Sequence, residues 1–355
     1  VNPMPAHAVG TVSVSLKRIY DNKTSNNVDY TYDNLLGPDI TSITPSTVAP
    51  NTSNTFSLTG TNFLNYGPIN LTSISTGNYH TCGVNSNGDG YCWGEGTYGK
   101  LGNGSTTNIS TPVLVSQGAR PAGVTFSSIS AGENHTCGVG SNGRGYCWGY
   151  NPYGQLGNGN TGTDSSIPVL VSKGDRPTGV TFTKVNAGRY HTCGIGSNGQ
   201  GYCWGYNASG QVGNGSTNPA YAPALVSQGA RPSGGTFTDI SAGGYYSCGV
   251  GNNGQAYCWG ANGNYQLGTG NTTGSSTPVL VIQGARPSNV TYTSVDTGHQ
   301  HTCGLGSDGN GYCWGNNTDG HLGDGTTTNR STPVLVKLFD QYEYQITIGN
   351  NTLAQ

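Results

Sequence analysis

The sequence predicts an all-β protein: a five-bladed β-propeller with four-stranded blades, together with a small region of β-strands formed by the two ends of the chain. Three observations support this prediction. A segment of about 55 residues is repeated five times. Each copy contains four short β-prone segments separated by Gly, Asn and Pro, and no part of the chain has the period of a helix. Such repeats are typical of propeller blades, and a solenoid of stacked repeats is the alternative.

The composition argues against several classes of protein. Of 355 residues only 8% are charged, and the net charge is −2, so we expect no surface for nucleic acid or for an acidic membrane. No apolar run is long enough for a membrane span. The chain begins at Val1 without the apolar core of a signal peptide, which we interpret as a processed form. Thirteen Asn-x-Ser/Thr sequons, among them Asn22 and Asn103, give weak support to a secreted glycoprotein.

Residues 1–66 precede the repeats and are predicted to contain strands. Val12, Val14 and Leu16 alternate with polar residues, which is typical of a strand with one apolar face. Residues 37–45 and 55–63 are similar to the opening of the immunoglobulin-like TIG family, and this similarity implies part of a sandwich over residues 40–63. A donor strand over residues 9–18 would complete it in the same chain or in a neighbouring copy. We expect the neighbour, because the partial sandwich lacks strands of its own.

Residues 67–338 are predicted to form the propeller, and the cysteines show its repeat most clearly. The words His-Thr-Cys-Gly and Tyr-Cys-Trp-Gly recur, and the predicted strands of the second copy are residues 126–130, 135–139, 145–149 and 169–171. In the first copy a loop at residues 86–88 would pair Asn85 with Asp89 and place two cysteines opposite each other. We therefore predict a disulfide in each blade rather than zinc, whose ligands have shorter spacings: Cys82 with Cys92, Cys137 with Cys147, Cys193 with Cys203, Cys248 with Cys258, and Cys303 with Cys313.

The order of the segments also predicts how the ring closes. A Pro-Val/Ala-Leu-Val segment follows each Cys-Trp-Gly unit, first at Pro112 and last at Pro333. The first unit has no such segment before it, and the last has one left over. We therefore expect residues 333–336 to seal the ring against the first blade, which would remove an exposed sheet edge.

The repeats resemble those of the regulator of chromosome condensation family. In the second copy the resemblance is carried by residues 129–136 (Ile-Ser-Ala-Gly-Glu-Asn-His-Thr), 141–149 and 153–159 (Tyr-Gly-Gln-Leu-Gly-Asn-Gly), and it covers about residues 69 to 336. It implies a propeller, usually of seven blades, whereas this chain has material for five. The paired cysteines stand where the family usually has aliphatic residues. The secreted bacterial branch of the family is therefore the closer parallel, rather than its nuclear members.

Three other side chains recur with the repeat, and each has a functional and a structural interpretation. The histidines could hold a metal, the tryptophans could stack on sugars, and the arginines could meet acidic glycans or a neighbouring subunit. Because each occupies the same place in its own blade, we expect hydrogen bonds, core packing and pinned loops instead. The positions are His80, His135, His191 and His301; Trp93, Trp148, Trp204, Trp259 and Trp314; and Arg120, Arg176, Arg231 and Arg286.

Residues 339–355 form a tail in which an alternating pattern returns. The alternation predicts a strand with an apolar face, and a lone strand of this kind needs a partner. The positions expected to contact another subunit are Tyr342, Tyr344, Ile346 and Ile348.

Two functions fit these features. We expect no enzyme, no cofactor and no metal site, because no nucleophile–base pair, phosphate loop or ligand cluster stands out. The first hypothesis is a structural subunit of an extracellular filament or surface assembly, a head-to-tail homopolymer joined through its terminal strands. The alternative is a secreted adhesin or inhibitor-like module that recognises a cell-surface protein or glycan through loops at residues 95–111, 150–167 and 206–221. Ten regularly paired cysteines predict an extracellular or cell-surface location in either case.

Overall fold

The computed structural model describes residues 12–15, 39–44, 55–61 and 69–337, and the chain divides into two units between Ile69 and Asn70. In the first unit β1 (Val12–Ser15), β2 (Asp39–Thr44) and β3 (Thr55–Thr61) form an antiparallel sheet in the order β1-β3-β2. Val12 lies opposite Leu58. The central part of the expected donor strand thus pairs with β3 of its own chain, whereas Leu16 lies outside the described residues.

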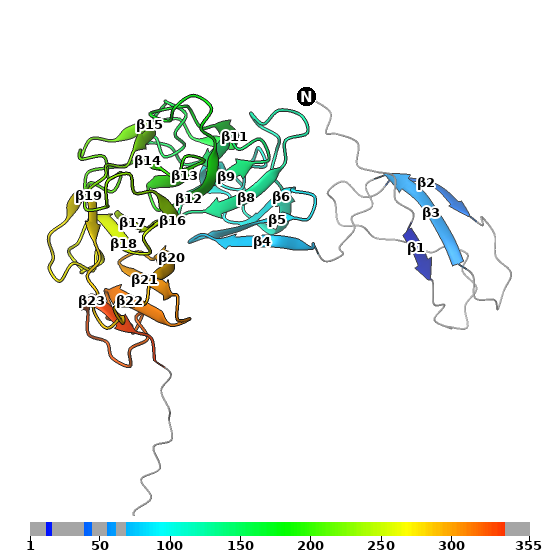
Figure 1. Cartoon of the computed structure of the whole chain (residues 1–355). Helices are drawn as coiled ribbons and strands as arrows, with labels where there is room; N and C mark the ends of the chain where they lie inside the picture. The colour runs from blue at the N-terminus through cyan, green and yellow to red at the C-terminus, as the bar shows by residue number, and fades with distance from the viewer. Residues whose placement is uncertain (1–11, 16–38, 45–54, 62–68, 338–355) are drawn as a thin grey trace, which may run out of the picture. The chain divides into compact units, whose positions relative to one another are not determined.

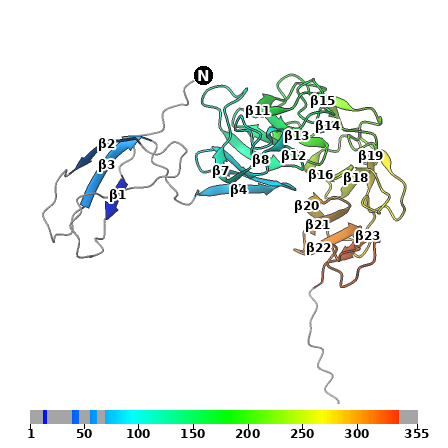
Figure 2. The same cartoon turned by 180° about the vertical axis from the view of Figure 1, so that it is seen from behind.

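The second unit consists of five four-stranded antiparallel sheets, which are the blades of a propeller (Figure 1). The all-β prediction and the blade count are both confirmed. The blades follow one another in chain order along an arc, from β4 in cyan to β23 in red, as the view from behind also shows (Figure 2). Within each blade the four strands lie in the order of the sequence.

The strands of the first two blades are β4 (Leu71–Thr76), β5 (His80–Asn85), β6 (Gly90–Gly94) and β7 (Ile109–Leu114), then β8 (Phe126–Ala131), β9 (His135–Gly140), β10 (Gly145–Gly149) and β11 (Ser165–Leu170). A short 3-10 helix, η1 (Thr97–Gly99), lies between β6 and β7. The third and fourth blades contain β12 (Phe182–Ala187), β13 (His191–Gly196), β14 (Gly201–Gly205) and β15 (Ala220–Leu225), then β16 (Phe237–Ala242), β17 (Tyr246–Gly251), β18 (Ala256–Gly260) and β19 (Ser275–Leu280). The fifth contains β20 (Tyr292–Thr297), β21 (His301–Gly306), β22 (Gly311–Gly315) and β23 (Arg330–Leu335).

The hairpin between the second and third strands of each blade sets the position of its disulfide. In the first blade the Asn85 N–H donates to the Asp89 carbonyl at 3.0 Å, and Gly88 adopts a φ of 80°, which only glycine takes without strain. This register places Cys82 opposite Cys92. The same pairing recurs in every blade, so all ten cysteines form the five disulfides that the spacing predicts.

The predicted closure of the ring is wrong. The last Pro-Val segment lies in β23, which pairs with β22 of its own blade, and the first lies in β7, which completes the first blade. Each outer strand therefore belongs to the Cys-Trp-Gly unit before it, because the connecting loop returns the chain antiparallel to the third strand. The outer strands also begin earlier than predicted, at Ser165 in the second blade, and they tolerate Pro168 because they are edge strands.

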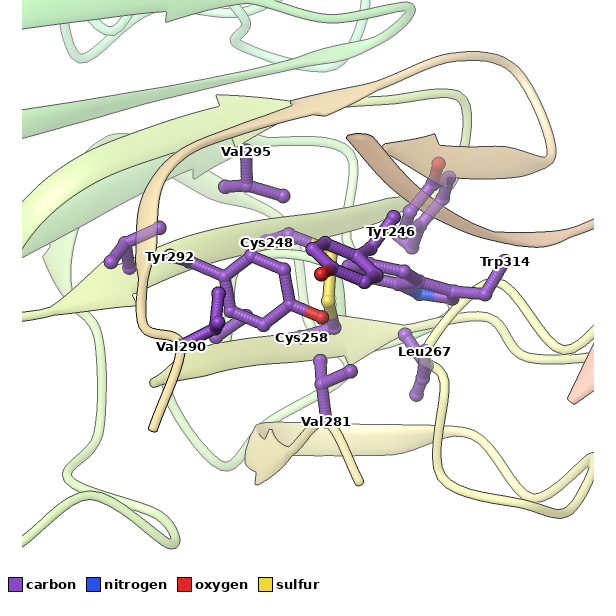
Figure 3. Close-up of a cluster of buried hydrophobic side chains, with 12 residues drawn as sticks. Tyr246, Cys248, Cys258, Leu267, Val281, Val290, Tyr292, Val295 and Trp314 are labelled. Carbon is purple, nitrogen blue, oxygen red and sulfur yellow. A yellow bond between two sulfur atoms is a disulfide. The ribbon is translucent and has the colours of Figure 1, made fainter. Parts of the chain in front are cut away.

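The core lies between the blades rather than within them. In the cluster of Figure 3 the Cys248–Cys258 disulfide of the fourth blade, with Val281 and Leu267, packs against Tyr292 and Trp314 of the fifth. Equivalent clusters join the first blade to the second, the second to the third and the third to the fourth. We call the contact between two successive blades a joint. Burial of each such aliphatic or aromatic side chain contributes about 1.5–3 kcal/mol, so the joints hold the propeller together.

Candidate functional site: the axial mouth and the tyrosine belt

The inner strands of all five blades converge at one end of the propeller axis. Their last residues and the Gly-x pair after each strand line a cavity of about 320 Å³, which we call the axial mouth. Glycine is required for this approach: a Cβ on Gly243 would lie 2.7 Å from the Gly298 carbonyl oxygen of the next blade. Backbone bonds link neighbouring blades here, for example from Glu133 N–H to Gly188 O at 3.2 Å.

A small polar cluster from the second, third and fifth blades lies at the axial mouth, and its charged members are Glu133 and Arg189. The Arg189 guanidinium lies 3.1 Å from the Glu133 carboxylate and 2.7 Å from His299 Nε2. Because arginine can only donate, His299 accepts this hydrogen bond through Nε2. Burial, the largest single cause, lowers the pKa of Arg189, but the carboxylate of Glu133 and the hydroxyls of Tyr190 and Tyr245 together outweigh it, so the pKa lies above the usual value. The arginine therefore stays charged and presents donors toward the axis.

Six tyrosines form an aromatic strip beside the mouth, which we call the tyrosine belt. Successive rings contact one another with centroid separations from 4.5 to 6.5 Å. The Arg189 guanidinium lies over two of them, at 4.9 and 5.2 Å, and so connects the belt to the mouth. Burial and neighbouring phenols raise the pKa of Tyr150, so its hydroxyl remains a donor at neutral pH. The belt consists of Tyr98, Tyr150, Tyr153, Tyr190, Tyr206 and Tyr245.

This arrangement is suited to binding. Aromatic faces beside a cavity with a few convergent polar groups are typical of ligand sites. In the part of the chain that the structure describes, no group of three or more His, Cys, Asp or Glu side chains could hold a metal ion. None of the described helices is long and apolar enough to cross a membrane.

Three of the four repeated histidines, His80, His135 and His191, make hydrogen bonds between blades as predicted, whereas His301 stacks on His321 instead. His80 Nε2 lies 2.7 Å from Thr136 Oγ1, and that hydroxyl donates to the Lys100 carbonyl at 2.8 Å, so the imidazole is the donor. The buried Nδ1 atom has no partner among the described residues. Burial, the largest cause in each, lowers the pKa of His80, His135 and His191 to about 3, so all three are neutral.

The repeated arginines pin their own loops. Arg120 donates to the Val124 carbonyl at 2.7 Å and to the Ser116 carbonyl at 3.2 Å, and its guanidinium lies 4.1 Å from the centroid of Phe126. Arg176 and Arg231 repeat these contacts in the next two blades. The loop-pinning prediction is confirmed for these positions.

The tyrosine belt as a unit is not predicted from the sequence. Four of its tyrosines lie in the loops that were expected to carry specificity, but Tyr190 and Tyr245 lie in the variable pair between the repeated Gly and the repeated His or Tyr. That pair is the signal that could have identified the site, because it varies between copies whose neighbours are constant. The expected contact residues Tyr342, Tyr344, Ile346 and Ile348 lie outside the described residues.

Four-stranded blades arranged around an axis, with a polar mouth and an aromatic face, define a β-propeller with a binding-type site. The chain belongs to the family of the regulator of chromosome condensation (RCC1) repeat, whose model matches residues 87–139, 142–195, 198–250, 253–305 and 308–351. Each match begins in the hairpin of one blade and extends to the second strand of the next, except the last, which continues past β23.

Several known proteins are similar to this chain. The ultraviolet-B receptor UVR8 of Arabidopsis thaliana is 30% identical over 287 residues, which are 80% of this chain and 62% of the receptor. The human E3 ubiquitin-protein ligase HERC2 is 27% identical over 270 residues, or 76% of this chain and 5% of the ligase. The chain thus spans less than two thirds of the length of these relatives.

Solved structures support the fold. Human WBSCR16 superposes with a TM-score of 0.65 at 20% identity, covering 76% of this chain and 67% of that protein. Yeast RCC1 (Prp20), in its complex with Kap60, superposes with a TM-score of 0.50 at 18% identity and covers 76% of both chains. At these identities the likeness shows the fold alone.

Proposed function

We propose that this protein is an extracellular binding module that recognises an oligosaccharide on the tyrosine belt and at the axial mouth. The observation that carries the proposal is the continuity of six tyrosine rings with the Glu133–Arg189–His299 cluster. The five disulfides support the extracellular setting, because such bonds persist in oxidising compartments. The module binds and does not catalyse.

The chemistry of the site favours a sugar over other ligands. A pyranose has apolar C–H faces that stack on aromatic rings and a rim of hydroxyl groups that both donate and accept. The belt supplies the rings, and the mouth supplies donors from Arg189 and acceptors from Glu133. The mouth, at about 320 Å³, lies at the small end of the range for ligand pockets, about 300–1,000 Å³.

A glycan array tests this proposal. The purified chain should bind a subset of the oligosaccharides, and Tyr190→Ala should weaken that binding about tenfold, which corresponds to ~1.4 kcal/mol for one lost ring. Tyr221→Ala is the matched control, because Tyr221 is 42% exposed on the outer strand β15 and its ring lies beside Gly154 without pairing with a described ring of the belt. Absence of binding to every glycan, or equal binding by the Tyr190→Ala variant, would overturn the proposal.

A second candidate function is the structural subunit of an extracellular assembly. One observation favours it: side chains that are buried between blades elsewhere are exposed at the two ends of the arc, namely Ile74 in the first blade and Leu305 in the last. Assembly through terminal strands is a separate proposal, in which β1 (Val12–Ser15) leaves β3 of its own chain and pairs with β3 of a neighbouring copy. Deletion of residues 1–18 would then abolish filaments, and unchanged filaments from the truncated chain would contradict strand exchange.

A further inference from the structure

The arc contains four joints between successive blades, and all four use the same contacts. At the first joint the Lys100 carbonyl of blade one accepts two bonds from blade two, from Trp148 Nε1 at 2.9 Å and from Thr136 Oγ1 at 2.8 Å. Ile129 of blade two is buried against the disulfide of blade one. The later joints place Gln155, Gln211 and Gln266 at the accepting position and Trp204, Trp259 and Trp314 at the donating one.

The first blade carries the donating half of a joint, and no residue between 69 and 337 supplies the accepting half. We call this the head surface, and it consists of Leu71, Ile74, Thr81 and Trp93. Ile74 is 63% exposed, whereas its counterparts Ile129, Val185, Ile240 and Val295 are at most 8% exposed. Trp93 is only partly buried, although the four other tryptophans are fully buried. Its indole N–H has no acceptor among residues 69–337.

The fifth blade carries the accepting half, and no residue between 69 and 337 supplies its donor. This tail surface consists of His301, Leu305, His321 and Val336. Leu305 is 46% exposed and Val336 is 42% exposed, whereas their counterparts in the other blades are at most 4% exposed. A cavity of about 440 Å³ lies among these side chains beside the Cys303–Cys313 disulfide. In each of the four joints inside the arc, the inner strand and the tryptophan of the next blade occupy the corresponding place.

We propose that the tail surface of one copy binds the head surface of a second copy, and that this contact repeats the joint found between the blades. The second copy is the partner whose chemistry fits. Its Trp93 and Thr81 supply the two donors that the carbonyl at the His321 position accepts in the other blades. Its Ile74 fills the place that Val295 fills against the fourth blade.

The two ends do not satisfy each other within one chain. His301, whose counterparts bond a hydroxyl of the next blade, stacks instead on His321 at 4.7 Å. The succession of close approaches between the axial glycines runs from Gly77 to Gly298 and does not return to the first blade. A contact between unlike surfaces leaves one free head and one free tail on every oligomer, so association continues into a chain of copies.

Sedimentation velocity of the full chain over a range of concentrations tests the proposal. The wild type should form oligomers that grow with concentration. Ile74→Glu blocks the head and Leu305→Glu blocks the tail, and each variant alone should stay monomeric. An equimolar mixture should form a dimer and nothing larger, because one variant retains an open tail and the other an open head. Leu225→Glu, at an exposed position on outer strand β15 (43%), is the matched control and should oligomerise as the wild type does.

Three results would overturn the proposal. One is a wild-type chain that stays monomeric throughout. Another is a mixture of the two blocked variants that forms no dimer, which would show that the contact does not join head to tail. The third is a chain ending at Lys337 that associates when the full chain does not, since the tail surface would then be covered by residues 338–355 of its own chain. Circular dichroism of each variant, compared with the wild type, separates loss of contact from loss of fold.

Discussion

Two isoleucines at the same position of the repeat give a direct measure of what a joint contributes. Ile240 in the fourth blade is fully buried, and Ile74 in the first is 63% exposed. Replacing a fully buried isoleucine by alanine removes the transfer free energy of three carbons and leaves a cavity, which together cost about 3 kcal/mol. The same change at Ile74 removes little buried surface and should cost less than about 1 kcal/mol.

Guanidinium denaturation of the disulfide-bonded monomer, followed by circular dichroism at low protein concentration, compares the two variants. Ile240→Ala should lower the midpoint clearly, and Ile74→Ala should leave it almost unchanged at an unaltered slope. If Ile74→Ala destabilised the monomer as much as Ile240→Ala, the head surface would be covered within a single chain. The claim that the head surface is uncovered in the monomer would then be wrong.

Three further predictions concern the fold. Replacing Cys193 and Cys203 by alanine opens an 11-residue loop and should cost about 3 kcal/mol of unfolding free energy; peptide mapping without reduction that links cysteines of different blades would contradict the pairing. The three buried histidines have pKa values of about 3 in the folded chain and 6.5 in the unfolded chain. Their contribution to stability is therefore retained above pH 6.5 and is lost as the pH falls toward 3. At pH 5 the expected loss is about 2 kcal/mol for each histidine. A melting temperature that does not fall between pH 7 and pH 5 would refute this assignment. Gly157→Ala, with φ 66° and a Cβ 2.5 Å from Trp204 Nε1, should destabilise the chain more than Gly159→Ala, with φ 86° and open space, and equal effects on thermal melting would contradict the packing.

The local features of the fold could be predicted from the sequence because they depend on spacing. The hairpin from Asn85 to Asp89 fixes which cysteines face each other, and the same register occurs in all five blades. The structural roles of His80 and Arg120 followed from the same argument, since a side chain that recurs with the blade serves the blade.

The features that failed or were missed depend on contacts distant in sequence. Spacing does not show whether the segment at Pro333 pairs with the blade before it or with the first blade, because the same loop could lead the chain to either one. The tyrosine belt joins residues from different copies, such as Tyr98 and Tyr150, which are adjacent only once the blades are placed around an axis. Ile74 is exposed because no blade packs against it, although the same position is buried in the other four copies of the repeat.

Electron cryomicroscopy of the purified chain at concentrations where it associates tests the central claim most directly. That claim is that an open arc of five blades presents, at its two ends, the two halves of its own internal joint. The predicted result is density in which Trp93 of one copy packs beside Leu305 and His321 of the next, in the same geometry as Trp314 against the fourth blade. A closed ring in which Trp93 packs against the fifth blade of the same molecule would contradict it.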